Sequence, residues 1–256
     1  MKLKSTTIIL LIATAVLIAP GCRKYPKLVG NGQVTTEERS LFSFNEVESS
    51  DVFNVYIKHD SVYTATVEAE SNLIPYIRTI VNGNTLEIDT RENIESNYPI
   101  NVYVTTPIIK KASLSGSGYM SFDSLNTEYL EIVLSGSGEI SGYATASSLT
   151  TNISGSGNIN LEAYTNSCNA GISGSGNINL VGETLSGSFT ISGSGQINAF
   201  SFSQNECIAK ISGSGNMYLN VIDFLDVTIS GSGSIYYIGD PSINVSITGS
   251  GELIKQ

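Results

Sequence analysis

The chain has 256 residues, of which 41% are hydrophobic, so it can bury a core in one or two domains and is not a disordered chain. Only 14% of the residues are charged, and 23 acidic against 13 basic side chains give a formal net charge of -10 at pH 7. Because an acidic surface repels a phosphate backbone, nucleic acid is excluded as a partner.

Residues 1–21 have the organisation of a lipoprotein signal peptide. Two lysines precede an apolar run from Thr6 to Ile18, and the tetrapeptide Ala-Pro-Gly-Cys follows directly. This order predicts cleavage before Cys22 and lipidation of its thiol. The proline and alanine of the tetrapeptide depart from the usual sequence, so an ordinary signal peptide is the alternative.

The predicted lipid chains would hold the protein on a membrane without a transmembrane helix. We therefore expect a cell-envelope protein at the outer membrane or cell surface. Residues 22–33 would then be the lipidated cysteine and a tether, which contains Pro26 and two glycines.

Residues 34–111 predict irregular β coils that cap a longer β structure. The patterns are two alternating runs, a short helical turn and a hairpin with Asn-Gly at its turn, at Val52–Ile57, Thr64–Ala69, Ser71–Tyr76 and Val81–Ile88. A cap is needed because an open end of a β structure leaves backbone groups unpaired. We expect residues 34–256 to form one continuous domain.

Residues 112–256 contain eight copies of Gly-Ser-Gly at intervals of 18 to 20 residues, with an average of 19. The copies begin at Gly116, Gly136, Gly155, Gly174, Gly193, Gly213, Gly231 and Gly249. So constant a period indicates one structural unit stacked on itself.

Two apolar columns accompany the repeat. The residue two positions before the first glycine is Leu or Ile in every copy, and the residue four positions after it is Ile, Met or Leu. Apolar residues recur with a period of two on both sides of the tripeptide, which predicts strands. This period and the glycine density exclude helices.

A strand, a glycine corner and a second strand bury their apolar face only by stacking on neighbouring units. We therefore predict an all-β fold, a single-stranded parallel β-helix with coils of about 19 residues. We favour the right-handed form, because left-handed forms use hexapeptides. Equivalent residues would lie about 4.8 Å apart, so Asn158, Asn177, Gln196 and Asn216 could form a hydrogen-bonded amide ladder.

The repeated phrase Ser-Gly-Ser-Gly-x-Ile follows a distinctive segment, VFNVYIKHDSVYTATVEAESNLIPYIRTIVNGNTLEI, and a lipoprotein-like signal. Together they resemble the head GIN domain family of Bacteroidota, whose members are described as auto-transporter adhesins. The resemblance extends from Phe42 to the C-terminus. It implies a β-helical fold, a location in the cell envelope and a role in adhesion.

Cys168 and Cys207 each lie six residues before a repeat glycine, and Gly187 has that position in the coil between them. Two coils separate the cysteines by about 9.6 Å, which is too far for a disulfide. We predict two buried free thiols. With no CxxC spacing and no histidine nearby, we expect neither a metal site nor a cofactor.

No catalytic site is predicted. His59 is the only histidine, and we interpret it as a solvated turn residue rather than as part of a Ser-His-Asp triad. From residue 112 onward there is no arginine, the only lysines are Lys210 and Lys255, and the eleven acidic residues are scattered singly. This pattern argues against a lyase or a hydrolase. The residue after each tripeptide is acidic only at Glu139 and Glu252, so no calcium ladder is expected.

Tyr218, Tyr236 and Tyr237 are the candidate binding residues. They come from successive coils, and a row of exposed tyrosine rings could stack on sugars. The alternative is ordinary packing of tyrosines on a sheet. Two short stretches, Asp60-Ser61-Val62 and Asp123-Ser124-Leu125, also match a loose pattern for O-glycosylation.

Three functions remain open. The leading hypothesis is a non-catalytic envelope lipoprotein, an adhesin that binds an extracellular glycan or protein. The second is a structural scaffold that associates with its own copies as a homo-oligomer. The third is a polysaccharide-degrading enzyme, which requires two carboxylates converging in a groove.

Overall fold

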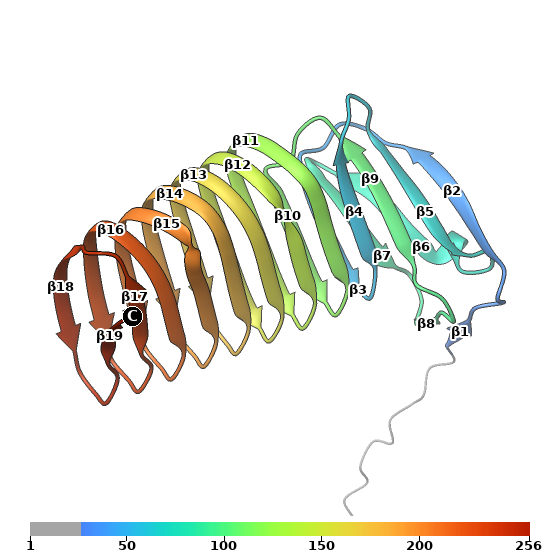
Figure 1. The fold of residues 1–256 in the computed structure, drawn as a ribbon. Coiled ribbons are helices and arrows are strands. Elements are labelled where there is room, and N and C mark those ends of the chain that lie inside the picture. The colour runs from blue at the N-terminus through green and yellow to red at the C-terminus, as the bar shows by residue number, and fades with distance from the viewer. Residues whose placement is uncertain (1–26) are drawn as a thin grey trace, which may run out of the picture.

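The computed structural model describes residues 27–256, and almost all of its regular structure is β-strand (Figure 1). The predicted signal peptide at residues 1–21 and the predicted lipidation site at Cys22 lie outside the described residues. Across the part of the chain that is described, none of the helical structure has the length and apolarity to cross a membrane.

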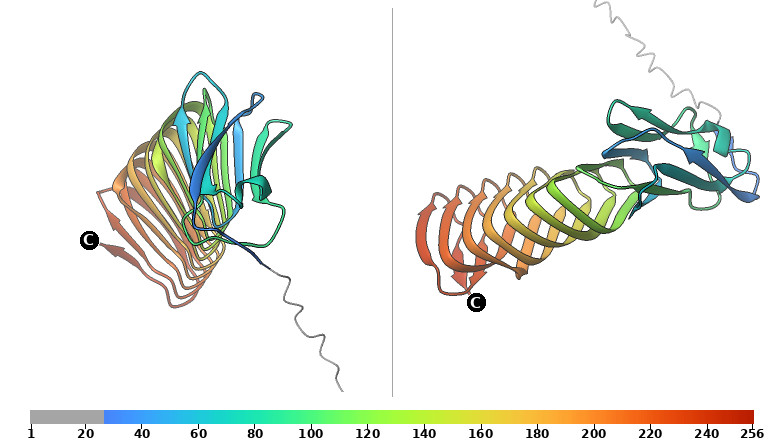
Figure 2. Two further views of the ribbon diagram at one scale, coloured as in Figure 1. Left: turned by 90° about the vertical axis from the view of Figure 1, so that its right-hand side faces the viewer. Right: turned by 90° about the horizontal axis from the view of Figure 1, so that it is seen from above.

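The second half of the chain is a stack of parallel coils (Figures 1 and 2). Six long strands each run from one Gly-Ser-Gly corner towards the next: β11 (Tyr119–Gly136), β12 (Glu139–Gly155), β13 (Asn158–Ile172), β14 (Asn177–Ile191), β15 (Gln196–Ile211) and β16 (Asn216–Ile229). Each pairs in parallel with the strand one coil away, so that Ile153 lies beside Ile172 and Ile172 beside Ile191. The predicted parallel β-helix with coils of about 19 residues is confirmed.

Shorter strands complete the two ends of the stack. β10 (Lys111–Gly116) begins it, and β17 (Ile235–Ile238), β18 (Ser242–Ile247) and β19 (Leu253–Lys255) end it. β18 pairs with β16 and β19 pairs with β17, both in parallel.

The N-terminal region is less regular but is hydrogen-bonded into the same sheet of 17 strands. Its elements are β1 (Leu28–Val29), β2 (Val34–Ser40), β3 (Glu46–Asp51), β4 (Asn54–His59), β5 (Thr64–Glu70), a 3-10 turn (Ile74–Tyr76), β6 (Ile77–Asn82), β7 (Thr85–Thr90), β8 (Ile94–Glu95) and β9 (Asn101–Thr106). β3 and β4 pair in parallel with β10 and β11, so they form a first coil. β2, β5 and β9 form an antiparallel set beside it.

Local signals in this region agree with the structure. β6 and β7 form the expected hairpin, whose two-residue loop is Gly83 and Asn84, and Gly83 has a φ of 62°. The expected helical turn is the short 3-10 turn. Part of the predicted tether is folded, because β1 pairs with β8.

The first coil has a corner that lacks the repeat glycines. Asp51 pairs with Gly116 and therefore stands where the repeats have the first glycine. Asp51 has a φ of 68°, a left-handed conformation that is uncommon for residues other than glycine, although asparagine and aspartate adopt it more often than the rest. The sequence around it contains no Gly-Ser-Gly, and for this reason the repeat pattern did not reveal this coil.

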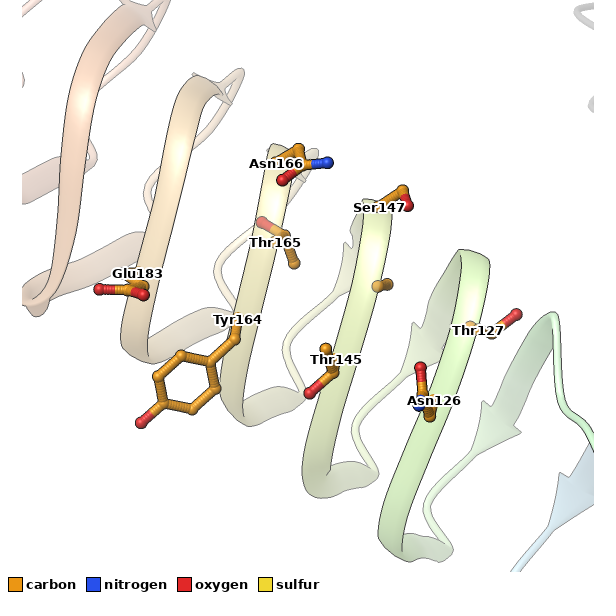
Figure 3. Close-up of a pocket in the computed structure, with 9 residues that line it drawn as sticks. Asn126, Thr127, Thr145, Ser147, Tyr164, Thr165, Asn166 and Glu183 are labelled. Carbon is orange, nitrogen blue, oxygen red and sulfur yellow. The ribbon is translucent and has the colours of Figure 1, made fainter.

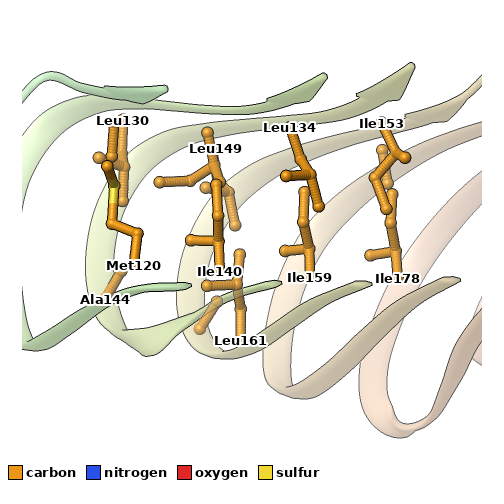
Figure 4. Packing of buried hydrophobic residues seen from close by; sticks show 14 of the residues in the cluster. Met120, Leu130, Leu134, Ile140, Ala144, Leu149, Ile153, Ile159, Leu161 and Ile178 are labelled. Carbon is orange, nitrogen blue, oxygen red and sulfur yellow. The ribbon is translucent and has the colours of Figure 1, made fainter. Parts of the chain in front are cut away.

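The apolar columns face the inside of every complete coil. Figure 4 shows Leu134 and Ile153 from one leg of the coils pointing towards Ile159 and Ile178 from the other. These four side chains are at most 2% exposed. The column ends at Ile247, which is 41% exposed because no coil lies beyond it in the described residues.

The alignment of the cysteines is also confirmed. Cys168 pairs with Gly187, which in turn pairs with Cys207, and both thiols are free and buried. Burial raises the pKa of Cys168 to about 12 and also raises that of Cys207. The side chain of Gln204 fills the space beside Gly187, since a Cβ on that glycine would lie 2.0 Å from Gln204 Oε1.

Candidate functional site

One outer face of the coils carries a chain of side-chain hydrogen bonds. Gln196 Nε2 donates to Asn198 Oδ1, Asn198 Nδ2 to Asn179 Oδ1, and Asn179 Nδ2 to Asn160 Oδ1, each at 2.6 Å. Asn160 Nδ2 then donates to Glu139 Oε1 at 2.9 Å. Every amide donates in the same direction, and the chain ends on a carboxylate, which makes this face ordered and polar.

This ladder differs from the predicted one. In the predicted column, Asn177 Nδ2 donates to Asn158 Oδ1 at 2.9 Å, but Gln196 turns to Asn198 instead of continuing the column. Glutamine has one more methylene than asparagine, so it reaches the next outward residue of its own strand. The signal for the longer ladder was the second asparagine column, two residues further along each coil.

The tyrosine row contains two of the three predicted residues. Tyr218 and Tyr236 stack with ring centroids 4.9 Å apart and an interplanar angle of 8°, and Phe200 meets Tyr218 edge-on at 5.4 Å. Tyr237 does not join them, because successive strand residues alternate in direction and its side chain, 9% exposed, faces the core. Tyr218 therefore lies between two neighbouring rings, and the ring of Tyr236 covers one of its faces.

A shallow groove of about 320 Å³ lies at the bend opposite the Gly-Ser-Gly corner (Figure 3). It crosses four successive coils and is lined by Asn126, Thr127, Thr145, Ala146, Ser147, Tyr164, Thr165, Asn166 and Glu183. Sequence reasoning missed this site. Asn126, Thr145, Tyr164 and Glu183 share one register position in successive coils, but their side chains differ in type, so the position shows no motif.

The groove combines an aromatic ring with free polar groups. The ring of Tyr164 projects at one side, 37% exposed, and the side chains of Asn126, Thr145, Asn166 and Glu183 project outward around it (Figure 3). Beneath them the hydroxyl of Thr165 donates to the hydroxyl of Thr184 at 3.0 Å, which fixes the floor.

The tyrosine of the groove is held by its neighbours. Tyr164 donates its hydroxyl to Glu162 Oε1 at 3.3 Å, and its ring centroid lies 5.8 Å from that of Tyr143. The negative charge of Glu162, together with partial desolvation, raises the pKa of Tyr164. The phenol therefore stays protonated and remains a hydrogen-bond donor at neutral pH.

The remaining predicted residues form no reactive site. His59 is exposed at the end of β4. Both Asp-Ser stretches lie at the surface, with Ser61 and Ser124 exposed, so their modification stays a prediction. Within residues 27–256, no cluster of three or more His, Cys, Asp and Glu is placed to hold a metal ion.

Solved structures with the same fold come from Parabacteroides species. A protein from Parabacteroides distasonis named "Putative lipid binding protein" is 28% identical, with a TM-score of 0.85 over 90% of this chain and 100% of its own. A "putative adhesin" from Parabacteroides merdae is 24% identical, with a TM-score of 0.86 over 90% of this chain and 99% of its own. A second "putative adhesin" from Parabacteroides distasonis is 24% identical, with a TM-score of 0.87 over 90% and 100%.

Sequence comparison gives the family. No curated protein matches the sequence. The family model described as "Putative auto-transporter adhesin, head GIN domain" matches residues 43–180 and again residues 141–241. These matches cover most of the described strands, from the first coil to the corner before β18. The chain therefore belongs to the head GIN domain family.

Proposed function

We propose that the protein is a non-catalytic adhesin of the cell surface and that the groove around Tyr164 binds a glycan. The family description and the names of the Parabacteroides adhesins support the adhesive role. The observation that supports glycan binding is the groove itself, in which an exposed ring lies among hydroxyl, amide and carboxylate groups. An apolar surface beside a few placed polar groups is the arrangement that orients a small polar ligand.

The ligand we propose is an extended glycan rather than a compact small molecule. The groove crosses four coils along the axis of the stack and is open to solvent along its length (Figure 3). Asn126 and Asn166 offer amide donors and acceptors at separate positions, and Glu183 accepts from sugar hydroxyls at the far end.

The proposal that the groove does not cleave its ligand rests on its carboxylates. Glycosidases place two carboxyl groups on either side of the scissile bond. Glu183 is the carboxylate that lines the groove, and Glu162 accepts a hydrogen bond from Tyr164 beside it. This arrangement favours binding over hydrolysis.

We further propose that Cys22 is lipidated and anchors the protein at the outer membrane or cell surface. The lysines, apolar run and small residues before Cys22 support this anchor. The folded region starts close to that cysteine, because Leu28 and Val29 already pair with Ile94 and Glu95. A short tether would keep the groove near the surface of the cell.

A glycan array with two matched variants tests the proposed groove. We expect the protein to bind a subset of glycans, and Tyr164→Ala to weaken binding about fivefold, since an aromatic contact contributes about 1 kcal/mol. Tyr129→Ala is the control, because Tyr129 is 42% exposed on the same stack and does not line the groove. Glycan binding that both variants weaken equally would contradict the proposal, as would release of shorter sugars.

A further inference from the structure

The last coil exposes residues that are buried in every other coil. All six residues of β18 are exposed, although Ile243, Val245 and Ile247 lie in register with Leu225, Val227 and Ile229 of β16. The three β16 side chains are fully buried, whereas Ile243, Val245 and Ile247 are 39%, 49% and 41% exposed. These positions are built as core, and in the single chain they face solvent.

The strands of the last coil also have one edge without a pairing partner in the described residues. β18 is paired only with β16, and β19 only with β17, in the described residues. The outer edge of each strand therefore presents unpaired N–H and C=O groups, which are a template for another strand.

The opposite end of the molecule protects its edge, and this end does not. The edge strand β2 carries Glu37, Glu38 and Arg39, charges of the kind that prevent strands from pairing with other chains. β18 has the sequence Ser-Ile-Asn-Val-Ser-Ile and carries no charge. Two copies of β18 can lie side by side without placing like charges opposite each other.

The outer face of β17 and β19 is apolar as well. The stacked Tyr218 and Tyr236 lead to Ile254 of β19, which pairs with Tyr236. In the last coil the side chains of Lys255 and Asp240 form an ion pair with each other. Glu252 is the other charged side chain of residues 239–256, and it is exposed without an ion-pair partner in the described residues, so the end surface carries one uncompensated side-chain charge.

We propose that the C-terminal end of the stack is an interface between two copies of this chain, with β18 pairing antiparallel to β18 of the second copy. A two-fold axis perpendicular to the long axis of the stack brings β18 against β18 and β19 against β19. The strand pairing on both legs of the coils then continues across the interface, and the exposed core residues of the two copies meet. The association is closed and stops at a dimer.

A head-to-tail arrangement is the competing geometry. It would place the uncharged β18 against the end that carries the charged β2, and repetition would produce an open filament. The contrast between the two edges favours the two-fold dimer.

The oligomeric state of matched variants tests this proposal. Sedimentation equilibrium of the full chain at micromolar concentration is expected to give twice the chain mass. Val245→Lys is expected to give the chain mass, because lysine charges would be buried in the paired edges. Val181→Lys is the control, since Val181 is also 49% exposed in a strand but lies on β14 in the middle of the stack, and it is expected to remain a dimer.

A second variant guards against a folding defect. Ile243→Lys, near the start of β18, is expected to give the same monomeric mass as Val245→Lys, with an unchanged circular dichroism spectrum. A wild-type protein with the mass of one chain would overturn the proposal. So would folded β18 variants that remain dimers, or a wild-type mass that keeps growing beyond two chains.

Discussion

Glu70 is a fully buried carboxylate that holds the start of the folded region in place. Its two oxygens accept hydrogen bonds from the backbone N–H of Gly32 at 2.5 Å, from the backbone and side-chain nitrogens of Asn97 at 2.8 and 3.0 Å, and from Ser96 Oγ at 2.8 Å. These bonds, led by that from the Asn97 side chain, lower the pKa of Glu70 to about 2. One ionised group therefore ties the segments around Gly32 and Asn97 to β5.

These hydrogen bonds to Glu70, which we call the Glu70 clasp, predict that the protein loses stability in acid. Because the folded pKa of about 2 lies below the ordinary 4.5, the stabilisation by Glu70 is complete above pH 4.5 and is lost as the pH falls towards 2. Thermal unfolding followed against pH is expected to show this loss. Glu70→Gln is expected to be less stable at pH 7 and to lose less stability on acidification, whereas Glu128→Gln, at an exposed position, should behave as wild type. Identical pH profiles for wild type and Glu70→Gln would contradict the clasp.

Gln204 presents the opposite case, a buried polar side chain without partners. Both of its amide atoms are buried and lack a hydrogen bond in the described residues. Leaving a buried amide unpaired costs about 1–3 kcal/mol, so Gln204→Met, which keeps the volume, is expected to raise the free energy of unfolding by about 1–2 kcal/mol. Gln196→Met is the control in the same coil, and it should not stabilise because it breaks the bond to Asn198. Denaturant unfolding measures both, and a loss of stability in Gln204→Met would refute the argument.

At the scale of the element, the Gly-Ser-Gly corner depends on close backbone contact between coils. Gly155 has a φ of 153°, and a Cβ there would lie 2.3 Å from the carbonyl oxygen of Gly136. We expect Gly155→Ala to lower the free energy of unfolding by about 2–3 kcal/mol. Ser156→Ala, in the same corner but exposed, is expected to change it by less than about 0.5 kcal/mol. Equal effects of the two substitutions in denaturant unfolding would show that the corner tolerates a side chain.

At the corner of the first coil, a substitution to glycine is expected to stabilise the protein. Asp51 holds a left-handed conformation at the position that is Gly116 in the next coil, and this conformation costs an L-residue about 1–2 kcal/mol. Asp51→Gly is therefore expected to stabilise the protein by about 0.5–1 kcal/mol, after the entropy cost of glycine. Asp51→Ala retains the strain and serves as the control, with no gain expected. Denaturant unfolding in which the alanine variant is the more stable of the two would refute the strain at this corner.

Much of the fold, but not the groove, could be predicted from the sequence. The repeat period and the alternation of apolar residues were sufficient to predict the coils, the inward Ile columns and the buried thiols of Cys168 and Cys207. Alternation also explains why Tyr237 faces the core beside the outward Tyr236. The groove around Tyr164 was not predicted, because the residues that share its position in successive coils, such as Thr145, Tyr164 and Glu183, differ in type and form no motif. The first coil was expected among the irregular coils of residues 34–111, but its corner could not be located, because Asp51 replaces the glycine that marks the others.

At the scale of the whole molecule, each coil contacts only its neighbours, so stability adds up along the stack and is lowest where a neighbour is missing. The N-terminal end has β2, β5 and β9 beside the first coil and the Glu70 clasp beyond them. The C-terminal end has the bare edges of β18 and β19. β1, in the described part of the predicted tether, lies at the covered end, and the unpaired edges of β18 and β19 lie at the other end (Figure 1).

This asymmetry predicts a gradient of hydrogen exchange along the stack. The amides of the central strands β12 to β15 have paired strands on both sides and are expected to exchange slowest. In the monomeric Val245→Lys variant, the amides of residues 242–247 are expected to exchange fastest, because β18 is exposed and paired on one side only.

The proposed dimer is expected to change hydrogen exchange only at the C-terminal end of the stack. In the wild type, pairing of β18 with its copy is expected to slow exchange in residues 242–247 while leaving the central coils unchanged, and Val181→Lys should match the wild type. Exchange measured by mass spectrometry at the same protein concentration separates the two cases. Equal exchange of residues 242–247 in wild type and Val245→Lys would mean that this edge stays free in solution, because a paired edge strand closes N–H groups that a single chain leaves open.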